Sequence, residues 1–158
     1  MENNTEPKKI KDCNIWEKIW AVQKEVKALI KDEETKSTNK MTNYKYFEEN
    51  QVLKVLKPLL ERYRLALAIR DNITSPPIYE KEGNNYLVKY LKTMTIVNID
   101  KENEKVNYGF WACGSNFDLA KAKGSAETYA MKYILSKFFL IRVLDENDPE
   151  LKETESKK

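Results

Sequence analysis

The sequence has no histidine and only two cysteines, Cys13 and Cys113. Without histidine, the chain cannot use Ser-His or Cys-His catalysis, and two cysteines cannot build an all-cysteine tetrahedral zinc site. A disulfide framework needs more thiols than these two, which lie in unrelated sequence contexts. We therefore predict two reduced cysteines and no metal site.

Long apolar runs are also missing. No segment approaches the roughly 18–20 apolar residues that span a bilayer. The N-terminus, MENNTEPKKIKDCN, contains no apolar stretch of the kind that a secretory signal needs. We therefore expect a cytoplasmic protein without a membrane partner.

Glycine is scarce, with four residues in the chain, and no glycine-rich phosphate-binding loop is present. The nearest feature, Gly124-Ser125, is too short to count. A carboxylate cluster occurs at Asp100, Glu102 and Glu104, but lysines are interleaved with it in a polar turn, which is typical of a solvated loop. We therefore predict that the chain is not an enzyme and binds no cofactor.

Charge is unevenly distributed along the 158 residues. Residues 36–142 hold 18 Lys and Arg against 11 Asp and Glu, a net charge of +7, whereas residues 143–158 hold 3 against 6, a net charge of −3. A basic body suits a polyanionic partner, although a lysine-rich surface also serves solubility alone. We predict a disordered N-terminus over residues 1–13, one domain over 14–142, and a charged, disordered tail over 143–158.

Hydrophobic periodicity predicts the main elements in order. The predicted helices cover residues 14–31, 48–63 and 118–140, with Pro58 kinking or splitting the second. A strand begins at Leu65, and residues 86–99 and 106–114 form a long β-hairpin. This order indicates an α+β fold, in which an antiparallel three-stranded sheet packs against helices.

Three local features leave alternatives open. Aromatic residues neighbour lysines at Tyr44-Lys45-Tyr46, Lys89-Tyr90 and Lys132-Tyr133, which fits base stacking beside phosphate contacts but also fits ordinary core packing. Gly124 either starts the last helix or allows it to pack closely on the sheet. Trp16 and Trp20 are expected in the core, with subunit contact as the alternative.

Several segments resemble the essential recombination function (ERF) family of phage single-strand annealing proteins. The segment GSAETYAMKYILSKFFLI, residues 124–141, resembles the family signature around Thr128-Tyr129. Four upstream segments follow the same order and spacing in that family: VQKE at 22–25, YKYF at 44–47, KPLL at 57–60 and YRLAL at 63–67. The resemblance covers residues 15–148.

The resemblance implies a fold similar to the strand-annealing ring proteins. It also implies a homo-oligomeric ring that binds single-stranded DNA and pairs complementary strands without ATP, in the cytoplasm of a bacterial host. A single-strand-binding protein or an exonuclease is the implied partner. The alternatives are a phage regulatory or host-takeover protein that binds another protein, and an RNA-binding module.

Combining the basic body with this resemblance, we predict that the hairpin and the last helix line a cationic groove for the DNA backbone. The predicted backbone contacts are Lys45, Lys89, Lys92, Lys121, Lys123, Ser125, Thr128 and Lys132. The candidate base-stacking residues are Tyr44, Tyr46, Tyr129 and Tyr133, although core positions are favoured for the last two.

Overall fold

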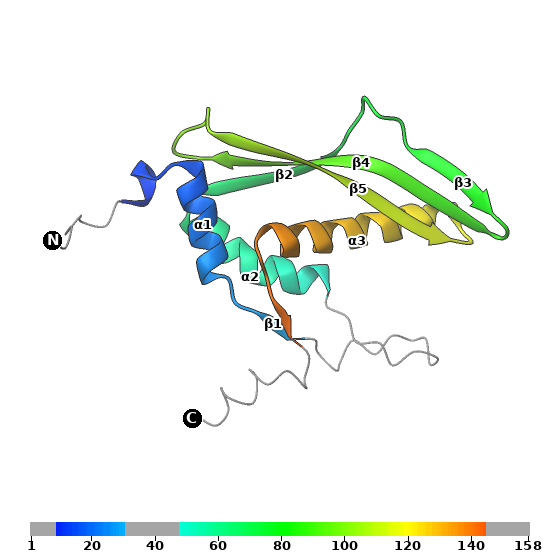
Figure 1. Ribbon diagram of the computed structural model, residues 1–158, viewed down its shortest axis with the longest axis horizontal. Helices are drawn as coiled ribbons and strands as arrows, with labels where there is room; N and C mark the ends of the chain where they lie inside the picture. Colours follow the sequence, from blue (N-terminus) through cyan, green and yellow to red (C-terminus); the bar gives the residue numbers. More distant parts are fainter. Residues whose placement is uncertain (1–8, 31–47, 145–158) are drawn as a thin grey trace, which may run out of the picture.

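The computed structural model describes residues 9–30 and 48–144, in which an antiparallel sheet carries helices on one of its faces (Figure 1). The long strand β4 (Asn85–Asn98) is central. Strand β5 (Lys105–Asn116) pairs along one edge of β4, while β2 (Leu65–Asp71) and β3 (Ile78–Glu82) share the other edge. The predicted α+β fold and the long hairpin are confirmed.

The sheet has four strands, whereas three were predicted. The additional strand is β3. Every residue of β3 is exposed, and its sequence, IYEKE, shows no apolar alternation. Strand β3 is held by backbone pairing to β4, in a register that runs from Ile78 opposite Lys89 to Glu82 opposite Asn85. A strand without a buried face leaves no period-two signal in its sequence.

Alternate residues of β4 are buried on the face of the sheet that carries the helices. The buried positions are Val88, Tyr90, Lys92, Met94, Ile96 and Asn98. The intervening residues point to the opposite face of the sheet, as successive strand residues must. No described helix covers that opposite face, as Figure 1 shows.

Helix α1 (Ile15–Glu25) begins at the predicted cap, since the Asn14 side chain accepts a hydrogen bond from the Glu17 amide. The helix ends six residues before the predicted boundary, because Leu29–Ile30 form a short strand, β1, that pairs in parallel with β6 (Val143–Leu144). A 3-10 turn, η1 (Ile10–Asp12), precedes α1 within the predicted disordered segment.

Helix α1 packs through Ile15, Ile19 and Val22, and not through its tryptophans. The expectation that Trp16 and Trp20 are core residues is wrong, because both are exposed. A buried lysine, Lys18, fixes the helix to the end of the hairpin. Its ammonium donates hydrogen bonds to the Asn98 side-chain oxygen at 2.5 Å and to the Asp100 carboxylate at 2.7 Å.

The remaining helices are α2 (Glu49–Arg62) and α3 (Leu119–Phe138). Pro58 lies inside α2 without splitting it. Both cysteines are free, as predicted. None of the helices among the described residues is long and apolar enough to cross a membrane.

Helix α3 packs on the sheet through Ala122, Ala126 and Ala130. The glycine that permits this approach is Gly114 on β5, where an added Cβ would lie 2.5 Å from the Ala122 carbonyl oxygen. Both expectations for Gly124 are wrong: α3 starts at Leu119, and an added Cβ at Gly124 meets no atom within 4 Å.

Candidate nucleic-acid interface

A line of polar and aromatic residues runs along the outer side of α3. The line consists of Lys121, Ser125, Tyr129, Tyr133 and Lys137, and we call it the α3 stripe. Residues four apart in a helix lie one above another on the same side. Four of the five side chains are exposed, and Ser125 is half-buried. The α3 stripe therefore places two tyrosines between terminal cations.

The two tyrosines form a stacked pair. The centroids of the Tyr129 and Tyr133 rings are 6.2 Å apart, and the ring planes differ by 16°. The side chains are 47% and 46% exposed, so the core positions favoured for them from the sequence are wrong. Exposed aromatic faces are the surfaces on which single-strand binders stack bases.

Lys132 lies beneath this pair and not on the surface. Its side chain is 3% exposed, and its ammonium lies 4.4 Å from the Tyr129 ring centroid and 5.1 Å from that of Tyr133. Burial lowers the pKa of Lys132, while the carboxylate of Glu48 acts in the opposite direction. The cation therefore acts on the aromatic pair, and its burial leaves little room for direct contact with a phosphate.

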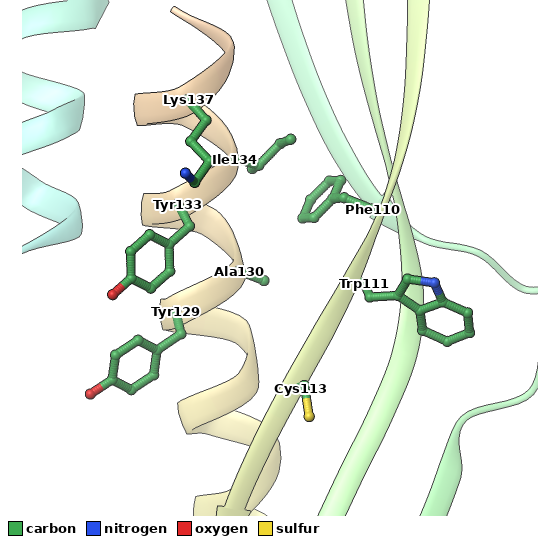
Figure 2. A pocket seen from close by; sticks show the side chains of 8 residues that line it. All are labelled: Phe110, Trp111, Cys113, Tyr129, Ala130, Tyr133, Ile134 and Lys137. Atoms are coloured by element: carbon green, nitrogen blue, oxygen red, sulfur yellow. The ribbon is translucent and has the colours of Figure 1, made fainter. Parts of the chain in front are cut away.

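Two hollows flank the α3 stripe. Figure 2 shows the first, a groove of about 430 Å³ between β5 and α3. Its lining consists of Phe110, Trp111, Cys113, Tyr129, Ala130, Tyr133, Ile134 and Lys137. Phe110 points toward the helix, whereas the Trp111 ring points away from it on the other side of β5. The groove is apolar and aromatic, and its only charged lining residue is Lys137.

The second hollow, of about 440 Å³, separates α3 from the start of α2. Ser125 and Thr128 line it, and the Thr128 hydroxyl donates a hydrogen bond to the Gly124 carbonyl at 3.1 Å. Glu48, Glu49 and the buried Lys132 line the same hollow, so its lining carries a net negative charge. These carboxylates disfavour a phosphate there, so the β5 side of the α3 stripe is the better path for a polyanion.

Lys92 is engaged within the fold. It is 3% exposed, and its ammonium forms ion pairs with Asp71 at 2.6 Å and with Glu127 at 2.7 Å. Tyr90 donates a hydrogen bond to Glu127 at 2.6 Å. Burial acts to lower the pKa of Lys92, but the hydrogen bonds from its ammonium to the two carboxylates hold that pKa above its ordinary value. Lys92 thus ties α3 to β2 and β4.

The other lysines that were predicted to contact the DNA backbone lie in different parts of the structure. Lys121 lies over the Phe117 ring at 5.3 Å, and Lys123 lies over the Tyr90 ring at 4.5 Å and near Asp71 at 3.5 Å. Lys89 points to the sheet face opposite α3, with Glu80 at 3.5 Å. Tyr44, Lys45 and Tyr46 lie outside the described residues.

The structure therefore brings together Lys121, Ser125, Thr128, Tyr129 and Tyr133 along one side of α3. Lys123 lies on the opposite side of the helix, beside Asp71 of β2 and Glu127. Lys137 and Phe117 were not among the residues predicted from the sequence. Lys137 could have been found, because it follows Tyr133 at the same four-residue interval. Phe117 precedes the helix cap Asp118, and no pattern in the sequence marks it as a neighbour of Lys121.

Comparison with protein families identifies the family of this chain. The described residues contain no group of three or more acidic or cysteine side chains that could hold a metal ion. Comparison with curated proteins gives no match. A sequence model of the ERF superfamily matches residues 15–158, which is nearly the whole chain and includes all of α3. The chain belongs to the ERF superfamily.

Proposed function

We propose that this protein binds single-stranded DNA along α3 and anneals complementary strands without ATP, as part of phage-type homologous recombination. The observation that carries the proposal is the α3 stripe, in which an exposed tyrosine pair lies between Lys121 and Lys137. Membership of the ERF superfamily supports the same function. A homo-oligomeric ring is part of the proposal, with a single-strand-binding protein or an exonuclease as a further partner.

The geometry suits binding that does not depend on base sequence. Lys121 and Lys137 are sixteen residues apart, which corresponds to about 24 Å along a helix. Cations at both ends can hold phosphates, and the stacked rings accept any base, because every base has an aromatic face. Contacts to phosphates and base faces leave the hydrogen-bonding edges of the bases open to a second strand.

The groove beside β5 indicates on which side of the α3 stripe the DNA backbone lies. Its lining includes Tyr129, Tyr133 and Lys137 and contains no acidic residue. We place the DNA backbone on this side of the α3 stripe and not on the side of Glu48 and Glu49. Lys123 lies outside this path, on the side of α3 that faces Asp71 of β2. Lys89 and Lys92 have no part in this path, because one faces away and the other is buried in ion pairs.

The test follows the joining of two labelled complementary oligonucleotides without ATP, with duplex DNA and RNA as comparison ligands. The parent should accelerate joining at low ionic strength and bind single strands more tightly than duplex. The double variant Lys121→Ala, Lys137→Ala should bind more weakly and lose roughly 0.7 from the slope of log affinity against log salt for each phosphate contact removed.

Lys57→Ala, at an exposed lysine on α2, provides the matched control. It should leave both the affinity and the salt slope unchanged. A parent protein that fails to accelerate annealing at low salt would contradict the proposal. Tighter binding to RNA than to DNA would favour an RNA-binding module, and binding to neither would favour a protein partner.

A further inference from the structure

All three tryptophans of the chain are exposed. Trp16, Trp20 and Trp111 are 60%, 62% and 60% accessible, although tryptophan is usually among the most buried residues of a folded protein. Two of them lie on α1 and the third lies on β5. Exposed tryptophans in groups mark surfaces that bind a partner.

The two tryptophans of α1 form a single line with Lys24. They are four residues apart, and Lys24 follows one turn later, with its ammonium 5.3 Å from the Trp20 ring centroid. The opposite side of α1 packs on the core. The helix thus presents two indoles followed by one cation, over about 12 Å from Trp16 to Lys24.

Trp111 belongs to the sheet face opposite the helices, which we call the outer sheet face. On β4 this face consists of Leu87, Lys89, Leu91, Thr93, Thr95 and Val97, of which one is charged. Leu91 pairs directly with Trp111. No described helix covers this face, and the Trp111 ring points outward from it (Figures 1 and 2). An apolar centre is therefore left open to solvent.

The outer sheet face becomes acidic toward β3. Glu80 pairs with Leu87 and Glu82 with Asn85, and both glutamates are exposed. The Lys89 ammonium lies 3.5 Å from Glu80 on the same face, so the two glutamates together leave one net negative charge there. From Leu91 to Leu87 the strand advances about 14 Å. An apolar centre followed by acidic residues therefore matches the order and spacing of the α1 line, in which two indoles are followed by a cation.

We infer that α1 of one copy docks on the outer sheet face of a second copy, with Trp16 and Trp20 against Leu91 and Trp111 and with Lys24 near Glu80 and Glu82. The inference rests on the homo-oligomer of the proposed function and names its contact surfaces. Because the two surfaces differ and belong to one chain, the contact is head-to-tail, which generates a ring where the rotation closes.

The size of the surfaces is consistent with this contact. Burying the exposed parts of three indoles removes roughly 450 Å² from water, taking about 250 Å² for a whole aromatic side chain. Of this area, about 300 Å² belongs to the α1 surface and about 150 Å² to the outer sheet face, whereas a stable interface buries about 800 Å² per partner, around a centre in which tryptophan is favoured. The indoles thus provide the centre of the contact, and the polar ends of the two surfaces provide its rim. The α3 stripe lies on the other side of the sheet and stays open to DNA.

The test measures particle mass in solution by mass photometry and sedimentation. The parent should form oligomers, while the variants Trp16→Ala, Trp20→Ala and Trp111→Ala should each be monomeric at the same concentration. A double variant, Trp16→Ala with Trp20→Ala, keeps the outer sheet face intact, while Trp111→Ala keeps α1 intact. A mixture of the two therefore has one intact pair of surfaces and should form dimers and nothing larger. Ile73→Ala, at an exposed apolar residue outside both surfaces, should assemble like the parent.

Two outcomes overturn the inference: a parent that stays monomeric at micromolar concentration, or variants that still assemble. A mixture that gives no dimers overturns the head-to-tail arrangement. Thermal unfolding of each variant shows whether the subunit is folded, and tryptophan emission of the parent should shift to longer wavelength on dilution as the indoles become solvated. Single-strand binding by the same samples is a separate readout, so a failed contact and a failed annealing function are distinguishable.

Discussion

The ammonium of Lys132 lies 4.4 Å from the centroid of the Tyr129 ring, at a position that is almost completely shielded from water. A cation this close to an aromatic ring is typically worth about 0.5–2 kcal/mol, and burial of the charge opposes this gain. The lowered pKa of Lys132 reflects that opposition. We therefore propose that Lys132 positions the tyrosine pair for stacking on bases and does not itself contact the DNA.

Lys132→Met keeps the length of the side chain and removes its charge. We expect weaker single-strand binding, because the ring pair loses the cation beneath it, together with an unchanged salt slope, because no phosphate contact is lost. The stability of the fold should change by less than about 2 kcal/mol, since the lost cation–ring contact and the relieved burial of charge act in opposite directions. A salt slope that falls as it does for Lys121→Ala would show that Lys132 contacts a phosphate directly.

The tyrosine pair gives a prediction about ring chemistry. Tyr129→Ala and Tyr133→Ala should each weaken single-strand binding by about 1–3 kcal/mol, the usual value of one base–aromatic stack. Tyr129→Phe and Tyr133→Phe should bind like the parent, because the aromatic face is retained. Fluorescence anisotropy with a labelled oligonucleotide measures both. Tyr79→Ala, at an exposed tyrosine on β3, is the control and should have no effect.

Gly114 and Gly124 differ in the space around them, and the sequence alone does not reveal this difference. At Gly114 a Cβ would lie 2.5 Å from the Ala122 carbonyl oxygen and 2.6 Å from the Ala126 amide nitrogen, so Gly114→Ala should destabilise the fold by about 1–3 kcal/mol. Gly124 lies inside α3 in open space, so Gly124→Ala should stabilise it by up to about 1 kcal/mol. Urea unfolding of the two variants should therefore give midpoint shifts of opposite sign.

Much of the fold could be predicted because burial leaves a period in the sequence. The Asn14 cap, the start of β2 at Leu65 and the hairpin of β4 and β5 follow from local patterns. Strand β3 has no buried side, and the pairing of β1 with β6 joins residues more than a hundred positions apart, so neither leaves a local signal.

The candidate site could likewise be predicted from the sequence only in part. The four-residue spacing on α3 indicates which residues share a line, but the burial of Lys132 depends on how α3 packs in the fold. A similar limit applies to Lys92, because apolar residues occur on both faces of β4 and the sequence does not mark which face the helices cover. Its ion pairs with Asp71 and Glu127 depend on the positions of β2 and α3 around it.

The ion pairs of Lys92 predict how stability depends on pH. A hydrogen bond from Lys92 lowers the pKa of Asp71, and the same partner, with Tyr90, lowers the pKa of Glu127 against the opposing effect of burial. Each carboxyl group thus binds its proton more weakly in the folded state than in the unfolded state. Their contribution is complete above the unfolded pKa values of about 4 and is lost as the pH falls below them.

Lys92→Met removes the common partner of both carboxylates. At neutral pH the variant should be less stable than the parent by about 1–2 kcal/mol, less than for a fully buried pair because both carboxylates are nearly half exposed. Between about pH 5 and pH 3 the parent should lose more stability than the variant, because the variant has no depressed pKa values to lose. Urea unfolding at several pH values measures whether the free energies of unfolding of the parent and the variant approach each other as the pH falls. Lys123→Met, which removes a weaker and more exposed partner of Asp71, should leave the pH profile almost unchanged, and an equal change in both variants would contradict the role of Lys92.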